Sequence, residues 1–142
     1  MTTTVPVIRQ VVFDSLNARR AAEFWRQLLD LAYREGHSPP PAGVDDSRGR
    51  EWLNLRTTSG APVLAFQQVD ELASSTWPNS GVPQQLHLDI TVPSLDDLRT
   101  SVARAIDLGA TLLFDRTDDS EEPLVVLGDP DGHPFCLFVL NL

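Results

Sequence analysis

The order of local patterns in the first half of this chain recurs in the second half, and this repeat restricts the fold more than any other feature. Shifting the chain by 77 residues places Gln10 on His87, near the start of a strand pattern, and Asn17 on Ser94, at a helix N-cap position. A helix pattern and further short strand patterns follow in both halves. Because identity between the halves is low, the pattern repeats rather than the residues. The sequence therefore predicts two units of the same βαβββ layout.

In the first half, residues 7–13 are mostly β-branched or apolar and predict a strand. A helix is indicated next by an apolar stripe with the spacing of one helix face, formed by Ala21, Phe24, Trp25, Leu28, Leu29 and Ala32. Beyond a loop rich in Pro, Gly and Asp, residues 51–56 and 63–69 predict two more strands.

In the second half, Ser94 with Asp97 three residues later resembles a capping box at the start of a helix. The apolar face of that helix consists of Leu95, Leu98, Val102, Ala105 and Ile106. Strands are predicted at residues 86–92, 111–114, 124–127 and 135–140, the last two joined by a turn at residues 129–132.

A sheet with one helix on one face leaves its other face uncovered, and two such units side by side can enclose a concave surface. We therefore predict an α+β fold in which two βαβββ modules form one curved, mostly antiparallel eight-stranded sheet with the helices on the outer face. The chain of 142 residues is expected to be a single domain, with module one at about 5–70, a connector at about 71–84 and module two at about 85–142.

Composition excludes several function classes. A net charge of −9 disfavours binding to nucleic acid or to anionic lipid. No apolar run approaches the roughly 18 residues of a membrane helix, and the N-terminal residues lack the pattern of a signal peptide. The single cysteine, Cys136, cannot form an internal disulfide, which is typical of a reducing compartment. From these features together, we expect a cytoplasmic protein without membrane or nucleic acid partners.

Four motifs together resemble one known superfamily. They are AAEFWRQLLDL in the first helix, TWPNSGVPQQLHLD before the second, SLDDLRTSVARAIDLGA within it and GDPDGHPFCLFVL in the last hairpin. This set, which covers nearly the whole chain, is similar to the vicinal oxygen chelate superfamily, and most of all to its glyoxalase-like subgroup. The resemblance implies a small organic ligand in the concave sheet and pairing of two copies as a homodimer.

The resemblance also implies positions for a divalent metal. Metal-dependent members use a His or Gln from the first strand, a His from the fifth, a Glu from the last and sometimes a Glu from the fourth. The corresponding positions here are Gln10, His87 and Cys136, with Ala65 or Gln67 on the fourth strand. Because no carboxylate is present among them, we expect no metal cofactor, with a divalent metal on Gln10 and His87 as the alternative.

Candidate site residues follow from this alignment and from side-chain chemistry. His87 is the candidate ligand contact or general base, and Asp89, two residues later, shares its sheet face and is the second catalytic candidate. Residues predicted to bind the ligand are Gln10, Trp52, Phe66, Gln67, Trp77 and His87. Cys136 lies in an apolar run and is expected to be inert, and His133 is expected to serve a turn.

Three hypotheses about function stay open. The first is a protein that binds a small organic molecule without a metal, for sequestration or sensing. The second is a metal-dependent lyase or isomerase of glyoxalase type, so the sequence does not decide whether the protein is an enzyme. The third is a domain whose only role is to pair with a second copy through a sheet edge or helix face.

Overall fold

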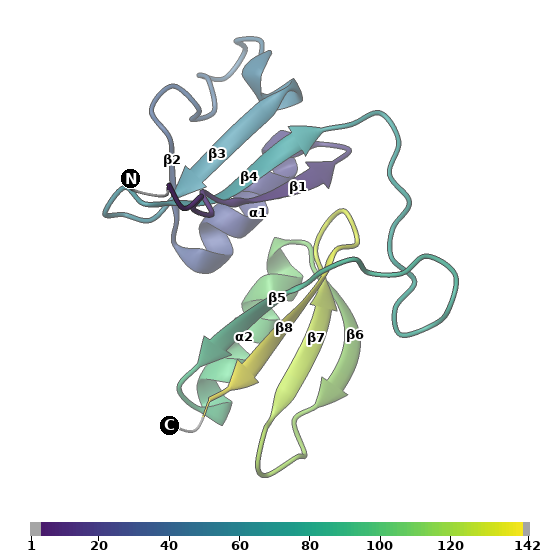
Figure 1. The fold of residues 1–142 in the computed structure, drawn as a ribbon. Helices are drawn as coiled ribbons and strands as arrows, with labels where there is room; N and C mark the ends of the chain where they lie inside the picture. Colours follow the sequence, from purple (N-terminus) through teal and green to yellow (C-terminus); the bar gives the residue numbers. More distant parts are fainter. Residues whose placement is uncertain (1–3, 141–142) are drawn as a thin grey trace.

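The computed structural model describes residues 4–140, and its elements form two modules of the same order (Figure 1). Module one contains β1 (Val11–Ser15), α1 (Ala18–Leu29), β2 (Ala32–Tyr33), a 3-10 turn (Arg48–Arg50), β3 (Trp52–Arg56) and β4 (Pro62–Gln68). Module two contains β5 (Leu88–Val92), α2 (Leu95–Leu108), β6 (Thr111–Arg116), β7 (Leu124–Gly128) and β8 (Pro134–Val139). The strands β1 and β5 begin at residues 11 and 88, and the helices at 18 and 95, so the predicted shift of 77 residues is confirmed.

Each module has a mixed four-stranded sheet. The strand orders are β1-β4-β3-β2 and β5-β8-β7-β6. The first and last strands of each module, β1 with β4 and β5 with β8, are parallel, and the other neighbours are antiparallel. The predicted α+β layout of two βαβββ modules is confirmed. Continuity into one eight-stranded sheet is not shown, since the pairing of the described strands gives two sheets of four.

Both helices begin at the predicted caps. The side chains of Asn17 and Ser94 each accept a hydrogen bond from the backbone N–H of the third helical residue. The end of α1, in contrast, comes earlier than its apolar stripe predicts. Asp30 adopts a left-handed conformation that reverses the chain, so Ala32 lies in β2 instead of in the helix. Within residues 4–140, neither helix is long and apolar enough to cross a bilayer.

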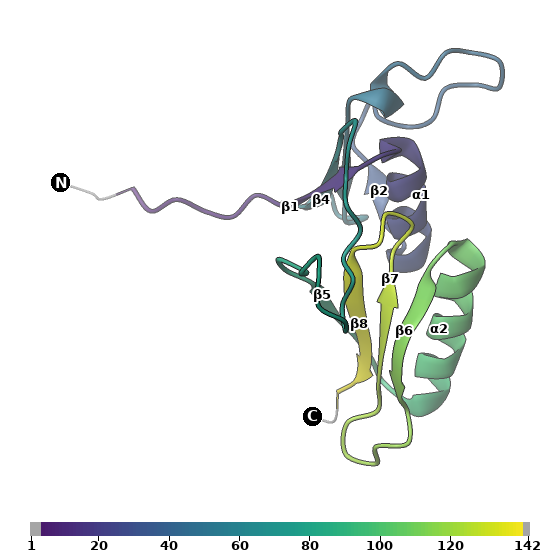
Figure 2. The ribbon, with the colours of Figure 1, turned by 90° about the vertical axis from the view of Figure 1, so that its right-hand side faces the viewer.

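The first strand also begins later than predicted. Residues 4–8, which we call the N-terminal arm, project from the body of the molecule on the side away from the helices (Figure 2). Val7 and Ile8 are 88% and 92% exposed, and β1 begins only at Val11, where pairing with Leu64 starts. The prediction of a strand from residue 7 is therefore wrong, because this part of the chain has no neighbouring strand to complete its hydrogen bonds.

The two faces of each sheet differ in what they contact. Phe13 and Phe66 face the helices and belong to the core, where the ring centroid of Trp25 of α1 lies 5.7 Å from that of Phe13 and 4.9 Å from that of Phe135. The opposite face, called the open face below, carries no helix in either module (Figure 2). The core thus continues across both modules through Trp25.

The last hairpin fastens module two to module one. In its turn, the Asp129 carboxylate accepts a hydrogen bond from Trp25 Nε1 at 3.2 Å. The Asp131 carboxylate accepts hydrogen bonds from Ser15 Oγ at 2.6 Å and from the Leu16 backbone N–H at 3.0 Å. Since Asp129 and Asp131 are 3% and 5% exposed, these bonds lie inside the contact between the modules and fix how they meet.

Candidate functional site

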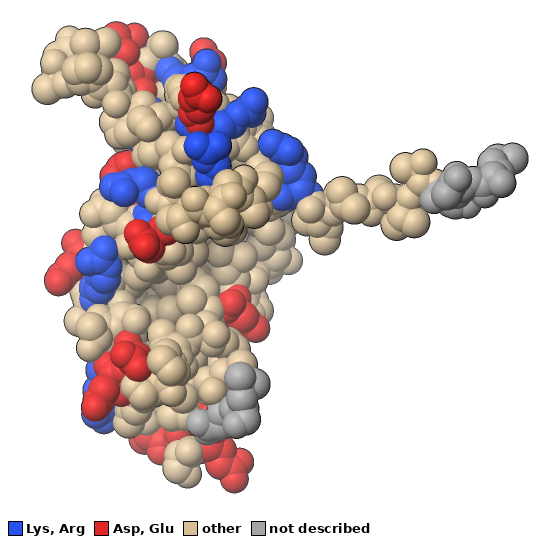
Figure 3. Space-filling model, turned by 90° about the vertical axis from the view of Figure 1, so that its left-hand side faces the viewer, with Lys and Arg blue, Asp and Glu red and all other residues tan. Residues whose placement is uncertain are grey.

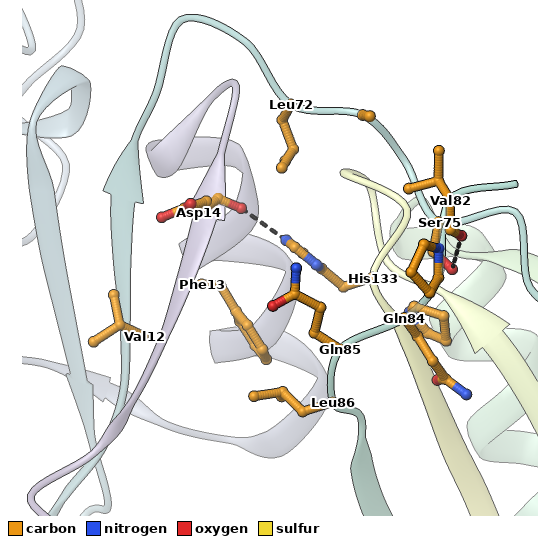
Figure 4. A pocket seen from close by; sticks show the side chains of 13 residues that line it. Val12, Phe13, Asp14, Leu72, Ser75, Val82, Gln84, Gln85, Leu86 and His133 are labelled. Carbon is orange, nitrogen blue, oxygen red and sulfur yellow. Dashed lines mark hydrogen bonds between the residues drawn. The ribbon is translucent and has the colours of Figure 1, made fainter.

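One candidate site is a cavity of about 400 Å³ where the two modules meet, called the junction cavity below. Its walls come from β1, from the segment between β4 and β5 and from the start of β8, as Figure 4 shows. The lining is formed by Val12, Phe13, Asp14, Leu72, Ala73, Ser75, Val82, Pro83, Gln84, Gln85, Leu86, His133 and Pro134. Apolar and polar groups therefore alternate around one hollow, as in sites for small organic molecules.

His133 is the most distinctive polar group of this cavity. Its Nε2 lies 2.7 Å from the backbone oxygen of Asp14, and its ring is stacked on Phe13 with 5.2 Å between centroids. Because a carbonyl oxygen only accepts, Nε2 carries the proton and Nδ1 of the neutral ring is an acceptor. Within residues 4–140, neither Nδ1 nor the Asp14 carboxylate has a hydrogen-bond partner, so both are available to a ligand.

The sequence did not indicate His133 as a site residue. The turn residues around it suggested a backbone role, and the turn is indeed present, with the His133 backbone N–H donating to Asp129. What makes the side chain part of a cavity is its contact with Asp14, which is 119 positions away in sequence. No local pattern could have revealed that contact.

Three predicted ligand residues lie together on the open face of module one. Gln10 and Trp52 are joined through Asn54: Trp52 Nε1 donates to Asn54 Oδ1 at 2.7 Å, and Asn54 Nδ2 donates to Gln10 Oε1 at 2.9 Å. Gln67 is the pairing partner of Trp52 on one side and of Asp14 on the other. This row connects the predicted residues to the wall of the junction cavity.

Phe66 lies on the other side of the same sheet. It is fully buried, and its ring is 5.7 Å from that of Phe13 between centroids, in the core beneath α1. The alternation of side chains along β4 puts Gln67 on the open face and Phe66 on the helix face. The structure therefore gives Phe66 a packing role, and it lines no described hollow of the open face.

The remaining predicted residues lie on module two, except Trp77, which belongs to the connector and contacts module two. His87 Nε2 is 3.2 Å from Asp89 Oδ1, and these two residues with Cys136 have ligand atoms within 4.8 Å of one another. Burial, and then the charge and hydrogen bonding of Asp89, raise the pKa of the Cys136 thiol to about 11. The thiol is thus protonated at neutral pH, in agreement with the inertness expected for it. Trp77 is placed against Phe114, with 6.4 Å between ring centroids.

Gln10 and His87 occupy equivalent positions in the two modules but do not line one hollow. Gln10 lines a hollow of about 140 Å³ in module one, called the module-one hollow below, together with Arg9, Arg34 and Arg56. His87 lines neither this hollow nor the junction cavity. Within residues 4–140, neither the junction cavity nor the module-one hollow joins Gln10 to His87.

Comparison with known proteins identifies the family from this arrangement of elements. The family model of the glyoxalase-like domain matches residues 10–138, almost the whole chain. The chain belongs to the glyoxalase-like domain family. No curated protein matches it.

Solved structures show the same vicinal oxygen chelate fold as this glyoxalase-like chain. A glyoxalase/bleomycin resistance protein/dioxygenase family enzyme from Burkholderia phytofirmans has a TM-score of 0.66 at 16% identity, covering 94% of this chain and 98% of that one. The fosfomycin resistance protein FosX from Mesorhizobium loti has a TM-score of 0.64 at 17% identity, with coverages of 98% and 96%. FosX from Listeria monocytogenes has a TM-score of 0.67 at 14% identity, with coverages of 98% and 94%. Identities this low establish the fold alone.

The metal ligands implied by the glyoxalase-like resemblance do not fit a divalent ion at Gln10. The only lone-pair oxygen of that side chain already accepts from Asn54, and three guanidinium groups line the same hollow. A cation placed there would share that oxygen with Asn54 Nδ2 and would be repelled by three positive charges. The residues that do converge are His87, Asp89 and Cys136, of which His87 and Cys136 are two of the positions that the resemblance implies.

Proposed function

We propose that this glyoxalase-like protein binds a small, partly apolar organic molecule in the junction cavity without a metal ion. The observation that carries the proposal is the cavity itself, which combines segments of both modules and the segment that joins them. Its volume of about 400 Å³ lies within the usual range of about 300 to 1,000 Å³ for ligand sites.

The polar groups of the cavity define what such a ligand needs. His133 Nδ1 accepts a hydrogen bond when the ring is neutral, and the Asp14 carboxylate accepts as well. A ligand with a hydroxyl or amino donor would satisfy both groups, and its apolar part would contact Val12, Leu72 and Leu86. A ligand longer than the cavity would extend over the neighbouring open face toward Gln67 and Trp52, which keeps these predicted residues within the proposed site.

The test uses the full-length protein with a chelator present throughout. Compounds that raise the melting temperature are titrated by calorimetry, and a ligand at 100 times its Kd should add about 2.7 kcal/mol of stability. Val12→Trp fills the cavity from β1 and should abolish binding, whereas Thr91→Trp, on the open face of module two, is the matched control and should not. Binding that survives Val12→Trp, or that requires added metal, would refute the proposal.

A second candidate function is that of a metal-dependent lyase or isomerase of glyoxalase type. One observation favours it, the cluster of His87, Asp89 and Cys136 on module two. Imidazole, carboxylate and thiolate are a ligand set that zinc accepts. Metal analysis of protein purified without chelators tests this candidate: it requires stoichiometric metal that His87→Ala removes. Metal-free protein with full ligand binding would eliminate it.

We further propose that two copies form a homodimer. The outer strands β1 and β5 leave one edge of each sheet unpaired, and the N-terminal arm exposes Val5, Val7 and Ile8. Sedimentation over a range of protein concentrations should show a dimer that deletion of residues 4–8 weakens. A monomer at every concentration would refute this proposal.

A further inference from the structure

Three arginines and no acidic residue line the module-one hollow. Its lining consists of Arg9, Gln10, Arg34, Asn54, Leu55, Arg56, Gly60 and Pro62. Figure 3 shows arginine side chains gathered around the base of the N-terminal arm, where this hollow lies. Because none of the lining residues is an acid, the three guanidinium groups create a local positive potential in a protein whose net charge is −9.

Four other arginines of module one contact carboxylates, whereas Arg48 does not. Ion pairs join Arg19 to Asp46, Arg26 to Glu23 and Arg50 to Asp45, and Arg20 reaches Asp131. Within residues 4–140, the three arginines of the hollow form no ion pair and no side-chain hydrogen bond. Their hydrogen-bond donors are therefore free to bind a ligand.

The amide network beside the arginines adds one more donor. Trp52 Nε1 can only donate, so the atom of Asn54 that it contacts must be the oxygen, and Asn54 Nδ2 must face Gln10. The contacted atom of Gln10 is consequently its oxygen, Oε1. Within residues 4–140, Gln10 Nε2, which carries two N–H donors, has no hydrogen-bond partner, and Gln10 lines the hollow. The buried Asn54, 6% exposed, fixes this orientation.

We propose that the module-one hollow binds the anionic group of a small molecule, a carboxylate or a phosphate. The guanidinium groups of Arg9, Arg34 and Arg56 neutralise and chelate it, and Gln10 Nε2 donates an additional hydrogen bond. Guanidinium forks match the geometry of both anions. A volume of about 140 Å³ is close to that of four or five water molecules at about 30 Å³ each, which suffices for one such group. The site is separate from the junction cavity, so the proposal does not depend on the function proposed above.

The experiment titrates the full-length protein, at low ionic strength, with inorganic phosphate in one arm and sodium acetate in the other. Saturable binding of one anion per chain in either arm is expected, and the tighter arm identifies the chemical class. Arg56→Gln and Arg34→Gln should each weaken it about tenfold or more, since each removes charged hydrogen bonds. Gln10→Glu, which keeps the oxygen that Asn54 contacts but adds a negative charge, should abolish it.

Arg48→Gln is the matched control. Arg48 is exposed, forms no ion pair within residues 4–140 and does not line the hollow, so its loss changes the net charge by the same amount. Binding should be unchanged in this variant. Failure of both anions to bind, or equal weakening in Arg48→Gln and Arg56→Gln, would overturn the proposal, because the effect would then come from overall charge alone. Circular dichroism of each variant confirms that the fold is retained.

Discussion

Replacing Asp131 by Ala should loosen the contact between the modules that forms one wall of the junction cavity. The Asp131 carboxylate accepts hydrogen bonds from Ser15 Oγ and from the backbone N–H of Leu16, both in module one. It also lies 3.5 Å from Arg20, whose side chain is 52% exposed. The substitution removes the acceptor and leaves the donors of module one in place.

The magnitude follows from what those donors lose. A buried donor left without a partner costs about 1–3 kcal/mol. Ser15 is fully buried, so the loss of a partner for its hydroxyl should cost an amount in the upper part of that range. Leu16 is 48% exposed, so water can replace the acceptor of its N–H and the cost there is smaller. The exposed Arg20 pair adds little. We therefore expect the free energy of unfolding to fall by about 2–4 kcal/mol.

Urea unfolding of wild type, Asp131→Ala and the exposed control Asp118→Ala measures this difference. The control should change stability by less than about 0.5 kcal/mol. Asp131→Asn keeps one acceptor oxygen and should fall between wild type and Asp131→Ala. If Asp131→Ala loses less than about 0.5 kcal/mol, the inter-module hydrogen bonds are not what positions the hairpin, and the argument is refuted.

Two further predictions concern protonation. Burial lowers the pKa of His37 below its ordinary value of 6.5, and its Nδ1 accepts a hydrogen bond from the Asn54 backbone N–H. The neutral ring therefore contributes to stability fully above about pH 6.5, and this contribution is lost as pH falls. The stability difference between wild type and His37→Gln should shrink between pH 7.5 and 5, and a constant difference would contradict this. Because its pKa is raised, the Cys136 thiol should react slowly with a disulfide reagent at pH 8. Asp89→Asn should lower the thiol pKa and accelerate the reaction. An unchanged rate would show that Asp89 does not influence the thiol.

The sequence by itself determined the order of the two modules and the starts of both helices, although it placed Ala32 in a helix and Phe66 at the ligand. Asn17 and Ser94 mark the two helix starts because a cap is a local hydrogen bond between residues three apart. Alternation along β4 separates Gln67 from Phe66 for an equally local reason. The limits of local patterns are visible at the N-terminal arm, where apolar residues predict a strand but no neighbouring strand is present to pair with them.

Only the tertiary structure decided which of these faces and turns form a site. His133 meets Asp14 across 119 positions, and Arg9, Arg34 and Arg56 converge on Gln10 from three separate segments. Such contacts depend on how the modules dock and how loops return, which Asp129 and Asp131 fix through hydrogen bonds to module one. The physical reason is that periodicity and capping act over a few residues, whereas a cavity is made by packing between segments that the chain order leaves far apart.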